Sequence, residues 1–309
     1  MNIDLVYLWV DDTDYDWKRK ILKYRENFSN YDEDAINPCR FYNNDELKYS
    51  LRSVEKYAPW IRKIFIVTDN QIPKWLNTDN PKIRIVDHKE IIPEKYLPLF
   101  NSCAIESRLP FIPDLSEYFL YANDDTLFWN SVDEDFFFKE EKPIFRMEKF
   151  FNRHKRKRLY GKTIQRAYDL VSQKYNCDFY AFYPHHNIDS YRKSVFMECI
   201  KVFQKEFDDT MSNRFREESD IQRSIVAFYS IAEGKGILKP VRLNLIQKIC
   251  GIARDSSCFN LRHNISKNIL KKKTKLICLN DSVNTTDKIR EKTREILEQK
   301  FSEKSSFER

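Results

Sequence analysis

Short apolar runs, rich in β-branched and aromatic residues, recur through the first 125 residues of the chain, and each run stops at acidic residues. They span residues 3–9, 63–68, 83–86 and 117–122. Runs of this length without polar alternation are typical of strands that are buried on both faces. The sequence therefore predicts four buried strands, each followed by a loop that carries carboxylates.

Helical spacing separates these strands and dominates the second half of the chain. Leu47, Leu51 and Val54 share one helical face ahead of a proline. Asn43 and Asn44 are the candidate N-caps of this helix. Further helices are predicted over residues 163–175, 191–207, 217–232 and 286–301, with a strand at 276–279.

This alternation predicts an α/β fold in which a sheet is flanked by helices. We expect one unit over residues 1–309, with a strand-rich half at 1–140 and a mainly helical half at 141–309. Ligands of such sheets bind beyond the carboxyl ends of the strands. The acidic residues that follow the strands are therefore expected on one rim: Asp11, Asp69, Asp87, Asp124 and Asp125.

Composition excludes several classes of protein. With 41% hydrophobic residues the chain is not disordered, and with four glycines and no GxGxxG or GxxxxGK[ST] run it lacks the usual dinucleotide and P-loop glycines. The seven cysteines form no CxxC pair, as expected of reduced thiols. We find no signal peptide and no apolar stretch near the ~18–20 residues of a membrane span. The chain is expected in the cytoplasm, free or peripheral at the inner membrane face.

The net charge of +7 is a modest basic bias. The basic runs at 152–168 and 267–275 lack the interleaved aromatic residues of a single-strand binder, so no nucleic-acid ligand is expected. Solvated faces are the first interpretation of these runs, and contacts with an anionic polymer or lipid surface are the second. Residues 152–162 are predicted to form a mobile loop.

The adjacent carboxylates Asp124 and Asp125 directly follow the fourth strand. Such a pair is a common arrangement for holding Mg²⁺ or Mn²⁺ against a diphosphate. A polar turn is the alternative, since Asp is a favoured turn residue. Asp11 and Asp12 pose the same choice after the first strand, between a metal or nucleotide contact and helix capping by Asp12 or Asp14.

Two further segments carry candidate chemistry. His185 and His186 offer a general base with an ordinary pKa near neutrality, although an isolated exposed histidine usually has no role. Zinc is not expected, because no cysteine or third histidine lies at ligand spacing. Arg216 and Asp220, four residues apart on a predicted helix, form either a surface ion pair or, for Arg216, a phosphate clamp.

Four segments, in order, resemble the Stealth family. The stretch from RFYNNDELKYS to IPKWLN, continuing into FNSCAIESRLPFIPDLSEYFLYANDDTLFW, closely resembles the long second block of that family. DLVYLWVDDTD is similar to the first block, and HHNIDSYRKS through FREESDIQRS to the third. ICLND and the closing FSEKSSFE are similar to the fourth.

This resemblance implies a Mg²⁺- or Mn²⁺-dependent transferase with a glycosyltransferase-like α/β core that uses UDP-sugars such as UDP-GlcNAc. The family includes bacterial capsule and cell-surface polysaccharide phosphotransferases. Matched motif by motif, the implied site residues are Asp11, Arg40, Asn44, Glu46, Asn101, Glu106, Asn123, Asp124, Asp125, His186, Arg216, Asp220, Asn280 and Asp281.

Two positions depart from the family pattern. Asp12 replaces a glycine of the first block, and Pro184 precedes the histidine pair where the family commonly has a proline after its histidine. Either His185 or His186 therefore takes the place of the family histidine, and we choose His186.

The implied reaction is attack of an acceptor hydroxyl on the β-phosphorus of a UDP-sugar, which releases UMP and joins the sugar-1-phosphate to a polysaccharide or lipid-linked glycan. The acidic pair and Asp11 would hold the metal, His186 would be the base, Asp220 would orient it, and Arg216 would clamp a phosphate. A metal-dependent glycosyltransferase that attacks C1 and releases UDP is a second hypothesis. A glycan- or nucleic-acid-binding module is a third.

Overall fold

A computed structural model describes residues 1–25, 35, 37–149, 158–178, 182–241, 255–261 and 267–309. Its central sheet has the strand order β3-β2-β1-β4-β9. The strands are β1 (Ile3–Leu8), β2 (Ile64–Thr68), β3 (Ile83–Asp87), β4 (Tyr118–Asn123) and β9 (Asp189–Arg192). β1 to β4 are parallel, and β9 runs antiparallel to β4. The four strands predicted from the apolar runs are confirmed, with ends that differ by one residue.

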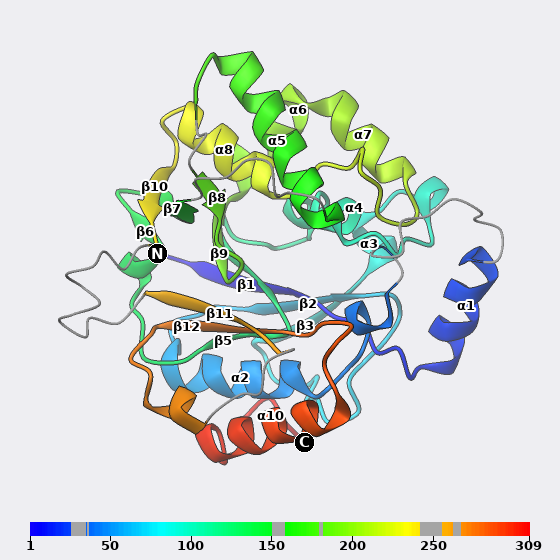
Figure 1. The fold of residues 1–309 in the computed structure, drawn as a ribbon, viewed down its shortest axis with the longest axis vertical. Coiled ribbons are helices and arrows are strands. Elements are labelled where there is room, and N and C mark those ends of the chain that lie inside the picture. Colours follow the sequence, from blue (N-terminus) through cyan, green and yellow to red (C-terminus); the bar gives the residue numbers. More distant parts are fainter. Residues whose placement is uncertain (26–34, 36, 150–157, 179–181, 242–254, 262–266) are drawn as a thin grey trace.

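The parallel strands are mostly apolar because helices cover both faces of the sheet (Figure 1). Along β1, Leu5 and Tyr7 pack in the cluster that contains Leu51 of α2 (Glu46–Tyr57), whereas Val6 packs in the opposite cluster. Alternate side chains thus enter two different cores, so neither face of these strands is turned to solvent.

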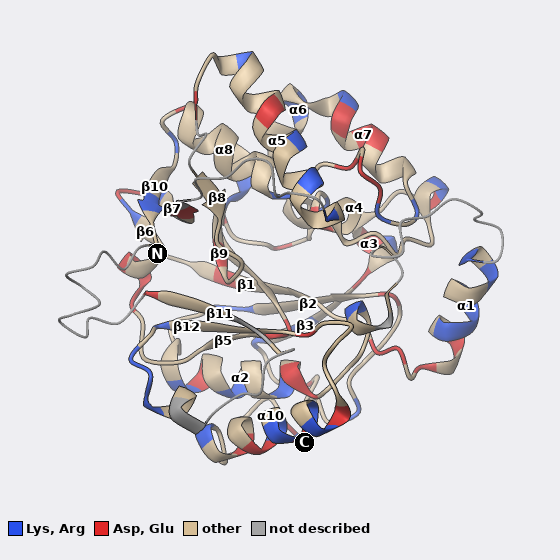
Figure 2. Cartoon of the chain, viewed as in Figure 1, with Lys and Arg blue, Asp and Glu red and all other residues tan. Residues whose placement is uncertain are grey.

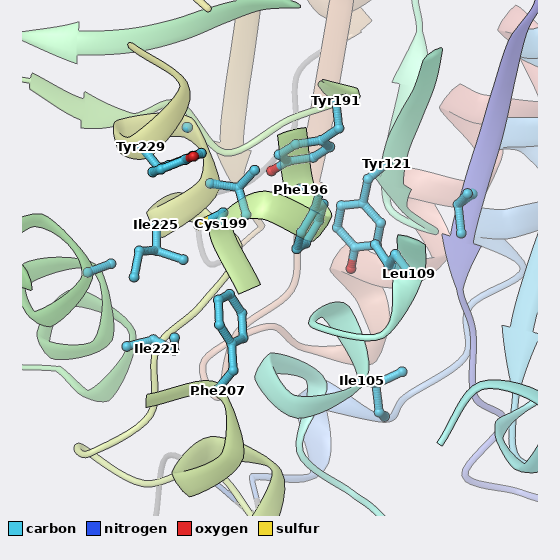
Figure 3. Packing of buried hydrophobic residues seen from close by; sticks show 14 of the residues in the cluster. Ile105, Leu109, Tyr121, Tyr191, Phe196, Cys199, Phe207, Ile221, Ile225 and Tyr229 are labelled. Atoms are coloured by element: carbon cyan, nitrogen blue, oxygen red, sulfur yellow. The ribbon is translucent and has the colours of Figure 1, made fainter. Parts of the chain in front are cut away.

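The larger core lies beneath helices of the second half of the chain. These are α5 (Leu159–Tyr175), α6 (Lys193–Val202), α7 (Gln204–Ser212) and α8 (Ser224–Ala232). Figure 3 shows Tyr191, Phe196 and Tyr121 gathered in this core, and the ring centroids of Tyr191 and Phe196 are 5.4 Å apart. Strands and helices are thus joined by aromatic packing, and the predicted α/β fold class is confirmed.

The C-terminal tail returns to the strand-rich half of the chain. β12 (Leu276–Asn280) pairs antiparallel with β5 (Thr126–Phe128) and parallel with β11 (Ser256–Asn260). α10 (Asp287–Lys300) lies beside α2 on the same side of the main sheet (Figure 1). The pairing of β12 with β5 places the tail next to the turn that carries Asp124 and Asp125.

The remaining elements lie outside the central sheet and its covering helices. The strands are β6 (Phe138–Lys139), β7 (Lys142–Lys149), β8 (Phe182–Pro184) and β10 (Ile237–Pro240). The helices are α1 (Tyr15–Arg25), α3 (His88–Ile91) and α4 (Ser102–Glu106), with 3-10 turns η2 (Pro38–Arg40), η3 (Glu94–Tyr96), η4 (Leu109–Phe111), η5 (Glu134–Phe136) and η7 (Lys267–Lys271). No helix in the described ranges has both the length and the apolar character to cross a membrane.

Two of the predicted helices differ from the structure. The helix predicted at 191–207 is two helices, α6 and α7, which meet at Phe203. The helix predicted at 217–232 begins only at Ser224. Its expected first turn is a loop, because the Asp220 carboxylate accepts a hydrogen bond from the backbone N–H of Glu217 at 2.9 Å and stabilises a turn instead.

The predicted caps of α2 are also corrected. The N-cap residue is Asp45, at φ 62°, and its side chain makes no capping hydrogen bond. Asn43 instead accepts a hydrogen bond from the backbone N–H of Asp45 at 3.1 Å. Asn side chains favour this local turn, so the helix starts one residue later than a side-chain cap would place it.

The basic segments are only partly described. Residues 152–157 of the predicted mobile loop lie outside the described residues, and residues 159–162 form the first turn of α5. The run at 267–275 begins with η7. On helices such as α10, residues of both charges are interspersed over the outer face (Figure 2).

Candidate active site

The carboxyl ends of the parallel strands form one rim, as predicted. The acidic residues after β2 and β3 lie away from those after β1 and β4. Leu8 of β1 lies opposite Asn123 of β4, while β3 is at the far edge of the sheet. Because strands are ~4.8 Å apart, Asp87 lies about 14 Å from the β4 end of the rim. Asp87 caps α3, and Asp69 accepts a hydrogen bond from Lys20 at 2.7 Å. These two acids are therefore structural.

Asp124 and Asp125 occupy the tight turn between β4 and β5. Thr126 fastens this turn by donating a hydrogen bond to the carbonyl of Asn123 at 2.6 Å. Burial raises the pKa of Asp124 to about 7, and the neighbouring charge of Asp125 adds to the shift. Burial also raises the pKa of Asp125 to about 6. Two adjacent, half-buried carboxylates with raised pKa values favour a positive ligand beside them.

The start of α2 brings further oxygen atoms to this pair. Glu46 is buried, and burial followed by the charge of Asp124 raises its pKa well above the usual range. Its carboxylate accepts a hydrogen bond from the backbone N–H of Asn44 at 2.7 Å. The side-chain carbonyl oxygen of Asn44 is buried without a hydrogen-bond partner among the described residues.

These donors fit a hard divalent cation. Oδ1 of Asp125 is buried and has no hydrogen-bond partner in the described part of the chain. Carboxylate and amide oxygens are the ligands that Mg²⁺ and Mn²⁺ prefer. A cation bound at Asp125, close to the charges of Asp124 and Glu46, would satisfy the unpaired oxygen and stabilise the ionised form of carboxylates whose pKa values burial raises.

His186 is the histidine that points to this rim. Asn123 Nδ2 lies 3.4 Å from His186 Nε2, and the Tyr160 hydroxyl lies 3.3 Å from Nδ1. An amide nitrogen can only donate, so Nε2 is the acceptor and the ring proton is on Nδ1. His185 instead points away, with Nδ1 at 2.6 Å from the Glu148 carboxylate.

The expected near-neutral pKa of His186 is corrected by its surroundings. Burial and the positive charge of Arg223 lower the pKa to about 3. The imidazole is therefore neutral at physiological pH, and its Nε2 accepts from Asn123, the residue directly before the acidic turn.

Arg223 anchors a buried network behind the histidine. It donates to Glu106 at 3.2 Å and to Asp189 at 2.9 Å. The Tyr121 hydroxyl lies 3.2 Å from the same Glu106 oxygen, whereas Oε2 of Glu106 is buried with no hydrogen-bond partner among the described residues. One positively charged guanidinium faces two carboxylates here. The second carboxylate oxygen of Glu106 is therefore open to a bound cation or substrate hydroxyl.

Asp220 does not orient His186, which corrects the role expected for it. Its carboxylate accepts hydrogen bonds at 2.8 Å from the amides of both Asn101 and Asn213. Asp220 is fully buried, and burial raises its pKa to about 6. It also makes no ion pair with Arg216 among the described residues, because it lies in a buried turn rather than on a helix face.

Arg216 donates instead to the hydroxyl of Ser102 at the start of α4. Burial raises the pKa of Cys103 to about 12, and the charges of Arg216 and Arg40 oppose this shift. Both arginines are thus within electrostatic reach of one point on α4. They bring positive charge to a site otherwise dominated by carboxylates, as a diphosphate ligand requires.

The predicted site residues near the two ends of the chain are Asp11, Asn280 and Asp281, and their surroundings differ. Asp11 accepts two hydrogen bonds from Thr13, at 2.9 and 2.7 Å, in the acidic loop after β1 (Figure 2). Asp281 pairs with Arg290 at 2.9 Å, and its charge contributes to the raised pKa of Asp125. Asn280 ends β12.

The structure does not unite Asp11, Asp124 and Asp125 as a three-ligand metal site. Within the described ranges, the group of three or more ligating side chains whose donor atoms all lie within 4.8 Å is Asp125, His186 and Cys278. Sequence reasoning missed Cys278, and it gave no role to Asp189, Tyr160 or Arg223. No periodic or spacing signal marks them, since their neighbours at the site come from distant segments.

Three conserved regions of Stealth proteins match this chain. Conserved region 1 matches residues 1–29, region 2 residues 40–145 and region 3 residues 185–232. The turn, the Glu46 and Glu106 carboxylates and the His186–Arg223 segment all fall within the matched regions.

Curated relatives are named as capsular polysaccharide phosphotransferases. WcwK of Streptococcus pneumoniae is 30% identical over 342 residues, covering 100% of this chain and 98% of the relative. Fcs1 of Haemophilus influenzae is 39% identical over 246 residues, covering 77% of this chain and 68% of the relative. LcbA of Aeromonas hydrophila is 36% identical and covers 78% of this chain and 68% of the relative.

Solved structures similar to this chain include the galactosyltransferase LgtC in complex with donor and acceptor sugar analogues. It has 12% sequence identity and a TM-score of 0.44, with coverage of 96% of this chain and 95% of LgtC. The glycosyltransferase GlyE of Streptococcus pneumoniae has 10% identity and a TM-score of 0.43, covering 98% of this chain and 64% of GlyE. With three matched regions and a relative aligned over its whole length, this chain belongs to the Stealth family.

Proposed function

We propose that this protein transfers a sugar-1-phosphate from a UDP-sugar, such as UDP-GlcNAc or a similar hexose donor, to a hydroxyl of a capsular or cell-surface polysaccharide or its lipid-linked precursor. A phosphodiester forms and UMP leaves. The observation that carries the proposal is the approach of a neutral imidazole, His186, to the carboxylate turn at Asp124 and Asp125. The curated relatives named as capsular polysaccharide phosphotransferases support it.

The acidic turn has the donors to hold the diphosphate through a divalent cation. Asp124 and Asp125 would supply carboxylate oxygens to Mg²⁺ or Mn²⁺, and the nearby Glu46 carboxylate would add negative charge. Such an ion, when bound, offsets charge on a diphosphate and on the departing UMP. Asp11, half-buried at the first-strand end of the rim, is assigned to the nucleotide side of the donor.

His186 takes the proton of the attacking hydroxyl. Its Nε2 is the unprotonated nitrogen, while Nδ1–H is held by the Tyr160 hydroxyl at 3.3 Å. Burial and the charge of Arg223 keep the ring neutral, and Arg223 is itself fixed by Glu106 and Asp189. The base is therefore held in its accepting form before the substrate arrives.

Arg216 and Arg40 would bind the phosphates from the side of α4, where their charges converge. The remaining matched residues, Asn44, Asn101, Glu106, Asn280 and Asp281, are assigned to the nucleotide-sugar and to support of the site. Asp220 and Asn101 brace the loop that carries Arg216, since they hydrogen-bond each other at 2.8 Å.

A metal-dependent glycosyltransferase is the second candidate, because a carboxylate turn that holds a metal also suits attack at C1. The two reactions differ in the bond that breaks and therefore in the nucleotide released. A panel of UDP-sugars incubated with enzyme, Mg²⁺ and acceptor separates them by chromatography. Metal-dependent release of UMP supports phosphotransfer, whereas release of UDP in proportion to glycan product refutes it.

A further inference from the structure

We propose that Asp125, His186 and Cys278 form a binding site for a thiophilic divalent cation, Zn²⁺, which overlaps the oxygen-ligand site and excludes Mg²⁺ from it. The three side chains come from the β4–β5 turn, the segment after β8 and strand β12. Their donor atoms all lie within 4.8 Å of one another. The inference does not depend on the proposed transferase reaction.

The donor chemistry separates this group from a magnesium site. A thiol, an imidazole and a carboxylate are the three ligand types of zinc, whereas Mg²⁺ takes oxygen ligands almost alone. The carboxylate has an open atom, because Oδ1 of Asp125 is buried without a hydrogen-bond partner among the described residues. The carboxylates of Asp124 and Glu46 nearby favour a cation at this point.

The spacing of sulfur and oxygen already suits a shared ion. Cys278 Sγ lies 3.5 Å from Asp125 Oδ2, with the thiol donating to the carboxylate. In a tetrahedral zinc site, bonds of about 2.3 Å to sulfur and 2.1 Å to oxygen separate these two atoms by about 3.6 Å. The thiol proton thus occupies the place where the ion would bind, and only His186 has to approach, by at most about 1 Å.

Binding is a ligand exchange without redox chemistry. Zn²⁺ takes up the Cys278 sulfur as thiolate, and the thiol proton passes to solvent. A ring nitrogen of His186 gives up its contact with Asn123 or Tyr160 and becomes the second ligand, and the Asp125 carboxylate is the third. Water completes the shell, as in open zinc sites.

Cys258 gives the site a route to solvent. It is the register partner of Cys278 on the parallel strand β11, and the two side chains hydrogen-bond. Cys258 is exposed whereas Cys278 is fully buried. An arriving ion therefore meets a surface thiol directly beside the buried one.

The test uses Co²⁺ as a spectroscopic probe of the full-length, reduced protein, without donor or acceptor. We expect one equivalent to bind with a thiolate-to-cobalt charge-transfer band in the near ultraviolet, and Zn²⁺ to abolish the band by displacement. Cys278→Ser should lose the band. Loss of an outer-shell hydrogen-bond partner lowers metal affinity about 10–100-fold, and loss of a direct ligand should weaken Zn²⁺ binding by at least as much. Cys177→Ser, which removes a thiol outside the site, should keep both.

Absence of the band from the wild type, or its retention in Cys278→Ser, overturns the proposal. Circular dichroism establishes that the variants are folded. If Cys278→Ser does not fold, His186→Asn decides, because it keeps the thiol and loses the ring nitrogen that faces the turn. Unchanged Zn²⁺ affinity in His186→Asn then overturns the proposal, and a loss of about tenfold or more supports it.

Discussion

Replacing His186 by asparagine removes the proposed base while disturbing the fold little. The carboxamide nitrogen of asparagine sits near the place of Nδ1, so the contact with Tyr160 is retained and Nε2 is lost. General bases contribute about 10²–10⁴-fold to rate, or about 2.7–5.5 kcal/mol of activation free energy. The lowered pKa of about 3 makes His186 a weak base in the free enzyme. We therefore expect a loss near the lower limit, about 10²-fold in kcat.

The matched control is His185→Asn. His185 is buried and bonds Glu148 through Nδ1 at 2.6 Å, a contact that asparagine reproduces. This variant should lose about 1–2 kcal/mol of unfolding free energy at most and keep kcat within about threefold of wild type. Initial rates of UMP release at saturating donor measure both variants. If His185→Asn is the damaging change, or if His186→Asn keeps kcat within about threefold, the assignment of the base is wrong.

The pH dependence extends the same test. Because the pKa of His186 is lowered to about 3, the ring does not titrate in kcat/KM between pH 5 and 9. The acid limb comes from Asp124 and Asp125, whose pKa values are raised to about 7 and about 6, since protons compete there with the cation. Higher Mg²⁺ should move this limb to lower pH. A limb that does not respond to Mg²⁺ and disappears in His186→Asn would contradict the assignment.

Three further changes test other parts of the site. Asp125→Asn should abolish turnover and also the rise in Tm on adding Mg²⁺. In the metal-free wild type the raised pKa values of Asp124 and Asp125 mean that the free energy of unfolding falls as pH rises through about 6–7. Mg²⁺ should restore this stability. An Asp125→Asn variant whose Tm still rises with Mg²⁺ would exclude Asp125 as a ligand. Arg216→Lys keeps the charge but loses the paired N–H donors of the guanidinium, so the rate of transfer should fall about 10–100-fold. If the variant and the wild type transfer at equal rates, Arg216 acts only as a point charge. Arg223→Met leaves Glu106 and Asp189 unpaired and should cost about 3–5 kcal/mol of unfolding free energy by urea denaturation; a loss under about 1 kcal/mol would exclude a buried ion network.

Much of the fold was predictable because its signals are local. The apolar runs that became β1 to β4 are recognisable from a few residues each, since both faces of those strands are buried. Their common direction then placed Asp11 and the Asp124–Asp125 pair on one rim. The His186 assignment rested on family resemblance, and the structure shows that this ring, and not that of His185, faces the rim.

The rest depended on contacts between distant segments. Zinc was not expected because no cysteine stood at ligand spacing, yet pairing of β12 with β5 brings Cys278 to within 3.5 Å of Asp125, 153 positions away. The spacing of Arg216 and Asp220 predicts a shared helix face, but the amides of Asn101 and Asn213 bind the Asp220 carboxylate in a turn. The lowered pKa of His186 likewise follows from burial beside Arg223, which no local pattern encodes.

The fate of the β-phosphorus tests the central claim most directly. The enzyme is incubated with Mg²⁺, a polysaccharide acceptor and a UDP-sugar that carries ³²P only at the β-position. Attack at phosphorus, assisted by His186, predicts that the label enters the polymer as a phosphodiester and that the released UMP is unlabelled. Label recovered in UDP, with sugar but no phosphorus in the polymer, would contradict the account.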